Sequence, residues 1–102
     1  MHLVQLFLPL ADNDSRRFPR SMFQEVEREL VAQFQGFTAY SRAPANGLWV
    51  SPSDDLQRDE LVVYEVLAER LDRPWWAGYR AKLEAQFRQE SILVRATGME
   101  LL

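Results

Sequence analysis

A single carboxylate interrupts an apolar run and is the residue that most suggests chemistry. Glu65 follows Tyr64 in the stretch LVVYEVL, and Glu60 comes directly before that stretch. A carboxylate in a buried strand must be paired, hydrated or neutralised by a raised pKa, and perturbed carboxylates serve as general acids or bases. Glu65, Tyr64 and Glu60 are therefore the candidate catalytic residues. The alternative is that Glu65 faces water or pairs with an arginine across the sheet.

Basic and aromatic side chains could hold a ligand beside such a carboxylate. Arg42 or Arg95 could steady an anionic substrate, and either could instead be the ion-pair partner of Glu65. Trp49 could line an aromatic pocket, whereas Trp75 belongs to a helical stripe and is expected in the core. Arg42, Trp49 and Arg95 are therefore candidate ligand-binding residues.

The polar triplet in FRQESILV, where a helical run becomes β-branched, supplies one more candidate. Gln89 could project into a cavity shared with Tyr64 or Trp49 and bind a ligand there. The alternative is that Gln89 and Ser91 hydrogen-bond to free carbonyl groups where the helix ends. We interpret the triplet first as the connection between the helix and the following strand, and second as a ligand-binding site.

Three arginines, Arg16, Arg17 and Arg20, come just before a predicted helix. Because a helix N-terminus presents free amides and positive partial charge, this cluster could hold an anion. The alternative is that the arginines are simply solvated in a polar loop.

Composition excludes several kinds of chemistry. The chain has no cysteine and one histidine, His2, so neither a soft-ligand metal site nor a disulfide framework is expected. No glycine-rich phosphate loop or nucleophile elbow is present, and we expect no metal and no cofactor. The 12 basic and 15 acidic residues are mixed along the chain, which argues against a nucleic-acid partner.

Length and hydropathy set the class of protein. The 102 residues, with 47% hydrophobic and 26% charged side chains, fit one globular domain covering 1–102. No apolar run approaches the roughly 20 residues of a membrane span. The apolar start LVQLFLPL lacks the basic region and cleavage site of an export signal, so we expect a strand there and a cytoplasmic protein.

The elements that would position these residues alternate between strand and helix. Residues 3–8 predict an inner strand, polar only at Gln5. A helix follows, with Ser21 and Gln24 as a capping box and an end near Gly36. Its apolar stripe is formed by Met22, Phe23, Val26, Leu30, Val31 and Phe34.

A strand is then expected over residues 37–42, followed by a tight turn at Asn46-Gly47. A bulge inside one longer strand is the alternative, so residues 48–51 belong either to a separate strand or to a bulged one. Residues 51–59 predict a polar loop, and the β-branched residues after it favour a strand.

The second half of the chain predicts a helix and a last strand. Asp72 caps that helix, with Pro74 in its first turn. Residues at four-residue spacing give it an apolar face, which is formed by Trp75, Trp76, Tyr79, Leu83 and Phe87. The last strand is expected over residues 92–97.

This order predicts an α+β protein with a ferredoxin-like sandwich, in which an antiparallel sheet carries both helices on one face. The strand segments LVVYEVL and LVQLFL are apolar at both parities, whereas a sheet with one wet face normally alternates. Something must therefore cover the second face, either a second subunit or a bound ligand. We expect a homodimer.

Several short motifs resemble a small bacterial domain family of unknown function. They are Gly36-Phe37-Thr38, Gly47-Leu48-Trp49, Glu60 before the long strand, Tyr79 and FRQESIL, in that order. The layout is also similar to dimeric α/β barrel proteins, in which two ferredoxin-like sheets face one another. The resemblance implies a dimer and a pocket between the sheets, and it implies no particular reaction.

Two functions remain in view. The first is a non-catalytic dimeric module that binds a small molecule or another protein. The second is a cofactor-free enzyme of the dimeric α/β barrel kind, with Glu65 or Glu60 as acid or base beside Tyr64.

Overall fold

A computed structural model describes residues 1–34, 45–50 and 56–102, with the backbone alone for 45–50 and 56–60. The elements, in chain order, are β1 (His2–Pro9), α1 (Arg20–Gln33), β2 (Ala45–Val50), β3 (Leu56–Ala68), α2 (Arg73–Gln86) and β4 (Val94–Gly98). The predicted strand over residues 37–42 lies outside the described residues. The predicted helix end near Gly36 is wrong, because α1 ends at Gln33 and the backbone of Phe34 is already extended.

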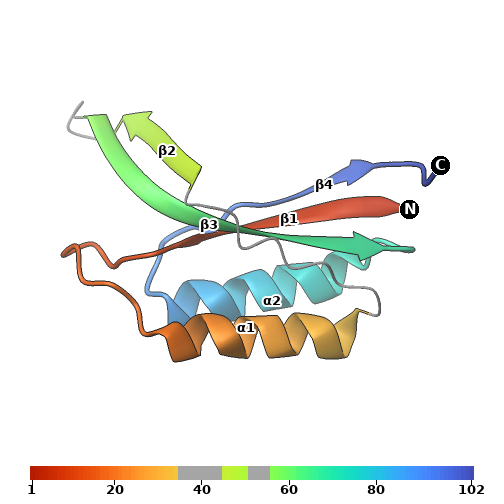
Figure 1. Ribbon diagram of the computed structural model, residues 1–102, viewed down its shortest axis with the longest axis horizontal. Helices are drawn as coiled ribbons and strands as arrows, with labels where there is room; N and C mark the ends of the chain where they lie inside the picture. The colour runs from red at the N-terminus through yellow and green to blue at the C-terminus, as the bar shows by residue number, and fades with distance from the viewer. Residues whose placement is uncertain (35–44, 51–55) are drawn as a thin grey trace.

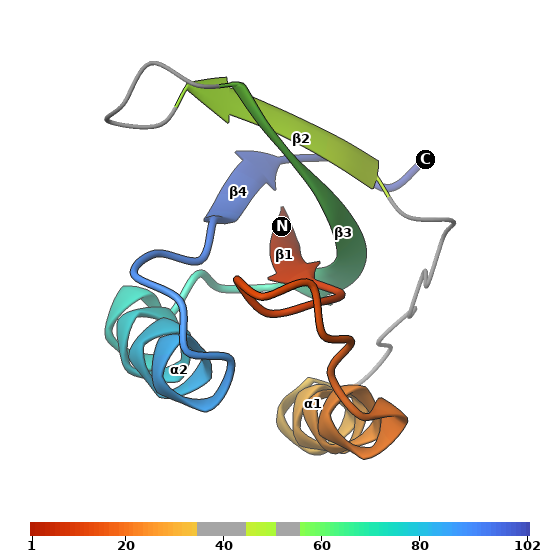
Figure 2. The same ribbon diagram turned by 90° about the vertical axis from the view of Figure 1, so that its left-hand side faces the viewer.

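The described strands form a four-stranded sheet in the order β2-β3-β1-β4, and each neighbouring pair is antiparallel. Figures 1 and 2 show α1 and α2 side by side on one face of this sheet. This is the split βαβ arrangement of a ferredoxin-like sandwich, so the predicted fold class is confirmed.

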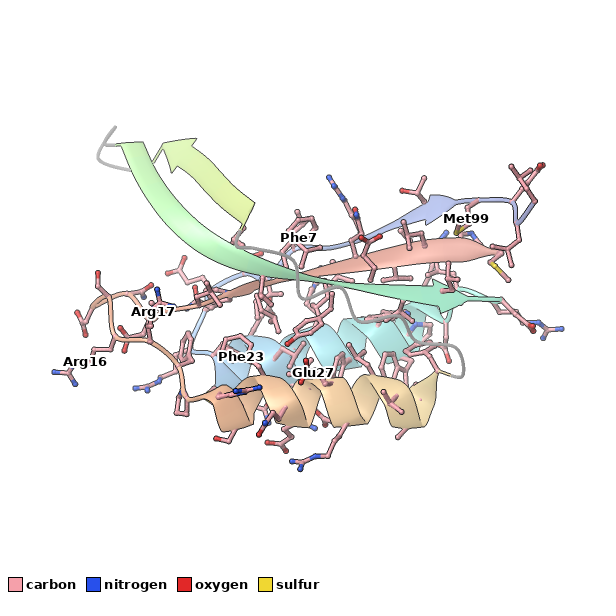
Figure 3. The ribbon with its side chains drawn as sticks, in the orientation of Figure 1. Phe7, Arg16, Arg17, Phe23, Glu27 and Met99 are labelled. Atoms are coloured by element: carbon pink, nitrogen blue, oxygen red, sulfur yellow. The ribbon has the colours of Figure 1, made fainter. Side chains whose placement is uncertain are left out.

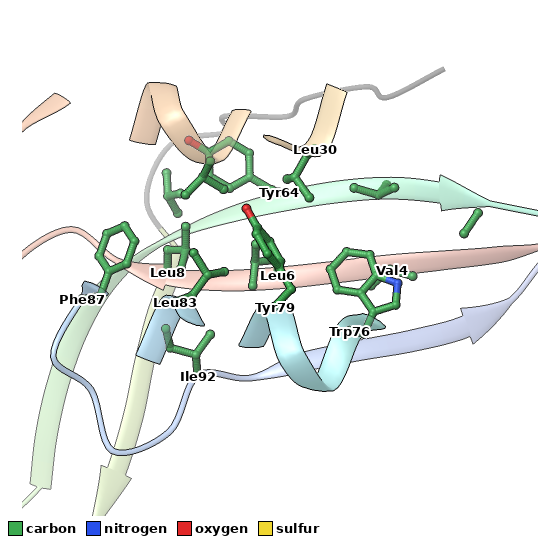
Figure 4. Packing of buried hydrophobic residues seen from close by; sticks show 14 residues of the cluster. Val4, Leu6, Leu8, Leu30, Tyr64, Trp76, Tyr79, Leu83, Phe87 and Ile92 are labelled. Atoms are coloured by element: carbon green, nitrogen blue, oxygen red, sulfur yellow. The ribbon is translucent and has the colours of Figure 1, made fainter. Parts of the chain in front are cut away.

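The core lies between the sheet and the helices. Val4, Leu6 and Leu8 of β1 are at most 1% exposed, and they point toward the helices with Tyr64 of β3. Figure 4 shows Leu30 of α1 and Leu83 of α2 closing over them from the helix side. Burial of one leucine side chain contributes about 1.5–3 kcal/mol, so this layer holds the helices on the sheet.

Helix α1 follows the predicted stripe with two corrections. Val26 and Leu30 are fully buried, but Val31 is 58% exposed because the next residue along a helix turns about 100° away from the sheet. The predicted capping box is also wrong: the helix begins at Arg20, so Ser21 lies inside its first turn and no side chain caps it. Pro19, which has no amide proton, occupies the N-cap position instead.

Helix α2 begins as predicted. The Asp72 carboxylate accepts a hydrogen bond from the Trp75 amide at 3.1 Å, and Pro74 lies in the first turn. Trp76 and Tyr79 are 6% and 7% exposed, whereas Trp75 is only partly buried and stacks on the Tyr79 ring. Trp75 therefore lies at the margin of the core.

The predicted turn at Asn46-Gly47 is wrong. Both residues lie inside β2, which pairs one-to-one with β3 from Ala45 opposite Leu61 to Val50 opposite Leu56. No residue is inserted in this pairing, so β2 is a single strand without a bulge. Strand β3 also begins at Leu56, earlier than predicted, because its partner β2 extends it into the segment interpreted as a loop.

Strand β3 belongs to two pairings that barely overlap. It pairs with β1 over Leu61–Ala68 and with β2 over Leu56–Leu61, so Leu61 alone is paired on both sides. Figures 1 and 2 show β2 and the first half of β3 bending away from the helices, onto the other side of the sheet. We call β2 together with residues 56–60 the ribbon.

No helix in the described part of the chain is long and apolar enough to cross a membrane.

Candidate functional site

Tyr64 and Glu65 point to opposite faces of the sheet. Tyr64 is 2% exposed and lies opposite Leu6 on the face that carries the helices. Glu65 lies opposite Gln5, and because strand side chains alternate it faces the other way. The structure therefore does not bring these two candidate catalytic residues together.

Glu65, Gln5 and Arg95 form a polar row across the helix-free face of β3, β1 and β4. Gln5 is paired with Glu65 on one side and with Arg95 on the other. The Arg95 guanidinium donates from Nε to Gln5 Oε1 at 2.7 Å and lies 5.0 Å from the centre of the Phe7 ring. Glu65 is half-buried and Arg95 is exposed, so both charges can be reached by solvent or by a ligand.

Apolar side chains surround this row on the same face. Leu3, Phe7, Val63 and Leu67 are only partly buried, and Leu93 is 55% exposed. Figure 3 shows Phe7 on the side of the sheet away from α1 and α2. We call the polar row and these apolar neighbours the helix-free face. It combines a cation, an amide and a carboxylate with apolar surface, which suits a small organic anion.

On the other face, Tyr64 and Tyr79 each point toward an acidic residue of α1. Burial, and then the charge of Glu27, raises the pKa of Tyr64. Burial likewise raises the pKa of Tyr79, whose hydroxyl donates to Glu29 at 3.3 Å, and Lys82 pairs with the same carboxylate. Both hydroxyls remain protonated near neutral pH, so they donate hydrogen bonds across the core.

The loop before α1 is held by the side-chain carboxylate of Asp12 and by a backbone β-bridge. Asp12 accepts hydrogen bonds from the amides of Asp14 and Arg16, both at 2.9 Å, and Ala11 forms a β-bridge with Arg17. Arg17 and Arg20 line a groove of about 350 Å³ with Tyr64 and Glu27. In Figure 3, Phe23 and Glu27 lie on the α1 side of this groove. The arginines are thus positioned beside Tyr64, a juxtaposition that sequence reasoning missed.

Gln89 has the structural role that its position at the helix end suggested. Its side-chain Nε2 donates to the Phe87 carbonyl at 2.9 Å, and Arg88 between them adopts a positive φ of 50°. In the same connection between α2 and β4, the Ile92 amide donates a hydrogen bond to the Glu84 carboxylate at 2.9 Å. Strand β4 begins only at Val94, two residues after the predicted start, because this connection occupies the residues before it.

The remaining candidates lie where little is described. Arg42 is outside the described residues, and for Trp49 in β2 and Glu60 in β3 only the backbone is described. Within residues 1–34, 45–50 and 56–102, no cluster of histidine, aspartate and glutamate side chains could hold a metal ion. Gln5 and Phe7 were missed as site residues, although Gln5 is the polar residue that interrupts the first apolar strand, as Glu65 interrupts the third.

Comparison with known proteins supports the fold and leaves the family open. No family model matches the chain, and no curated protein matches it either. The structure is similar to a phage SAM lyase solved in complex with S-methyl-5′-thioadenosine, with a TM-score of 0.51 and 18% sequence identity. The match covers 94% of this chain and 79% of that chain. At this identity the likeness concerns the fold alone.

Proposed function

We propose that the protein is a non-catalytic homodimeric module that binds a small organic anion on its helix-free face. The observation that carries this proposal is the row of Glu65, Gln5 and Arg95 within a partly exposed apolar surface. Arg95 supplies a cation whose orientation is fixed by Gln5, and Glu65 supplies an acceptor for an N–H or O–H group of the ligand. The similar phage enzyme, solved with S-methyl-5′-thioadenosine, supports a small molecule as the ligand, although that compound carries no negative charge.

A second copy of the chain is the natural cover for this face. Neither described helix lies on it, and Leu3, Phe7 and Leu67 stay partly exposed in one protomer. In a twofold interface each residue can meet its counterpart or a different residue of the partner. Because the row carries both a carboxylate and a guanidinium, two copies can place opposite charges together and close a pocket between them.

Ligand binding is tested by thermal shift with a panel of small carboxylates and phosphates, SAM and S-methyl-5′-thioadenosine. A ligand at 100 times its Kd stabilises the native form by about 2.7 kcal/mol. Arg95→Gln should abolish the shift, whereas Arg28→Gln, on the exposed side of α1, should leave it unchanged. A shift that survives Arg95→Gln would remove this site from the proposal.

The dimer is tested by light scattering at micromolar concentration. Leu67→Arg places a charge at the centre of the proposed interface and should give an 11.9 kDa monomer. Val31→Arg makes a comparable change at a side chain of α1 that is 58% exposed and should leave the dimer intact. A wild-type chain that scatters as a monomer would count against the dimer.

A cofactor-free enzyme is the second candidate, and the position of Glu65 beside Gln5 and Arg95 favours it. Glu65 would act as the acid or base, and Arg95 would hold an anionic substrate. The test is mass spectrometry of each thermal-shift ligand after incubation with the protein. Turnover that is lost in Glu65→Gln while the thermal shift is retained would favour catalysis over binding alone.

A further inference from the structure

A second surface, distinct from the helix-free face, lies where β4 meets α2. A groove of about 360 Å³ runs between them, lined by Val94, Arg95 and Ala96 of β4 and by Arg73, Trp76 and Arg80 of α2. Strand β4 ends the sheet order, so one of its edges has no neighbouring strand within the described residues. The groove therefore has a strand edge as one wall and a helix as the other.

The hydrogen bonds of β4 show which backbone groups face the groove. Phe7 donates its amide to Leu93 at 3.1 Å, and Met99 donates its amide to Met1 at 3.0 Å. In an antiparallel pair the residues alternate, so the odd-numbered residues of β4 face β1 while Val94, Ala96 and Gly98 turn their amides and carbonyls outward. Val94 and Ala96 also line the groove, so unpaired donors and acceptors lie along its wall.

The helix wall of the groove is basic. Arg73 and Arg80 are exposed at either end, and the small side chain of Ala77 leaves a hollow between them. Arg80 lies 3.9 Å from Glu84, at the limit of an ion pair, and keeps 52% of its side chain exposed. The start of α2 adds positive partial charge near Arg73. Negative side chains would therefore be favoured here.

The floor of the groove offers a further donor. Trp76 is 6% exposed, and its indole Nε1 has no hydrogen-bond partner among the described residues. A buried N–H without a partner is unfavourable, and an acceptor that reaches the floor of the groove would satisfy it. Figure 4 shows the Trp76 ring beside Val4 of β1, and both residues line the groove.

We propose that this groove binds an acidic peptide in extended conformation, which adds to β4 as a further strand. The peptide backbone pairs with the outward groups of Val94 and Ala96, and its alternate carboxylates meet Arg73 and Arg80. A second copy of this chain fits less well, because a twofold β4–β4 pairing would bring the same arginines of both copies together. Arg95 of the proposed ligand row also lines this groove, whereas Gln5 and Glu65 do not.

The probe for the test is a fluorescein-labelled peptide that alternates glutamate and valine over six residues. Its binding is measured by fluorescence anisotropy at low salt. Arg73→Glu and Arg80→Glu should each weaken binding by about tenfold, because a charge pair becomes a like-charge contact. Arg28→Glu makes the same change on α1 and should leave binding unchanged, apart from a small effect of net charge. A peptide with lysine in place of glutamate should bind at least about tenfold more weakly.

The backbone contribution is tested by Ala96→Pro. This change removes an outward amide that takes no part in pairing with β1, so the sheet should remain folded while the peptide binds about fivefold more weakly. Ala96→Val retains the amide and should bind like the wild type. Far-ultraviolet circular dichroism shows that each variant is folded.

Two results would overturn the proposal. One is equal affinity for the glutamate and lysine peptides, or affinity that is unaffected by Arg73→Glu, Arg80→Glu and Ala96→Pro. The other is conversion of a dimer to a monomer by Ala96→Pro, which would make this edge an interface between copies. Because Leu67 does not line the groove, Leu67→Arg should leave it intact, and peptide binding that persists in this variant separates this inference from the proposed function.

Discussion

The two faces of β1 differ although they share one backbone. Leu6 and Leu8 face the helices and are 0% exposed, whereas Gln5 and Phe7 between them face away and remain partly exposed. Both faces are rich in apolar side chains, but polar groups occur in a row only on the face without helices.

The same alternation separates two kinds of polar group. On the helix side, the hydroxyl of Tyr79 has a fixed partner in Glu29 and holds α2 to α1. On the helix-free face, Arg95 and Glu65 are oriented by the sheet and are still accessible. The comparison teaches that apolar content alone does not show which face of a strand belongs to the core. The contacts and exposure of the polar residues on each face are also needed.

The largest effect should come from the helix-facing layer. Leu6→Ala should lower the free energy of unfolding by about 2–5 kcal/mol, because it leaves a cavity in a fully packed site. Leu3→Ala on the opposite face should cost less than half as much. Urea denaturation in the Leu67→Arg background isolates the protomer, and equal losses would show that both faces are packed alike.

A pH titration tests the helix side alone, through Tyr64 and Tyr79, and the expected change in the free energy of unfolding is smaller. The pKa values of Tyr64 and Tyr79 are raised above the ordinary value of 10.0, so their contribution to stability is complete below pH 10 and is lost above it. The free energy of unfolding should fall above pH 10 by at most about 1.4 kcal/mol per pH unit for each tyrosine. Tyr79→Phe should remove its share of that slope, and an unchanged slope in denaturant titrations would contradict this assignment.

The smallest effect on stability is expected in the polar row. Gln5→Leu should change the free energy of unfolding by less than about 0.5 kcal/mol, because Gln5 lies on the partly exposed face. It should still weaken the ligand-induced thermal shift, because Arg95 loses the acceptor that orients it. A large loss of stability with an unchanged thermal shift would reverse the roles assigned to the two faces.

Local signals in the sequence predicted the start of α2, whereas the capping box predicted for α1 was wrong. Asp72 and Pro74 mark the start of α2 because both act within one helical turn. The sequence order of strands and helices was enough to predict the ferredoxin-like sandwich. Asn46-Gly47 misled because its tolerance of a turn was overridden by the pairing of β2 with β3.

The candidate site was only partly predictable, because the pairing register of β1 with β3 and β4 decides which side chains lie next to each other. Glu65 and Arg95 were both singled out, but nothing local shows that Gln5 pairs with each of them. The separation of Tyr64 from Glu65 could have been foreseen, because neighbours on a strand point to opposite faces. The groove beside β4 could not, because it depends on which strand ends the sheet and where α2 lies against it.

The single-residue overlap at Leu61 bears on how such a chain can diverge. The ribbon is joined to the rest of the sheet by continuity of one strand, so its length and direction depend on the twist of β3 and not on the helix-facing layer. Substitutions or insertions there would re-aim the ribbon without repacking α1 or α2. The ribbon and the helix-facing layer can thus change independently along separate parts of one strand.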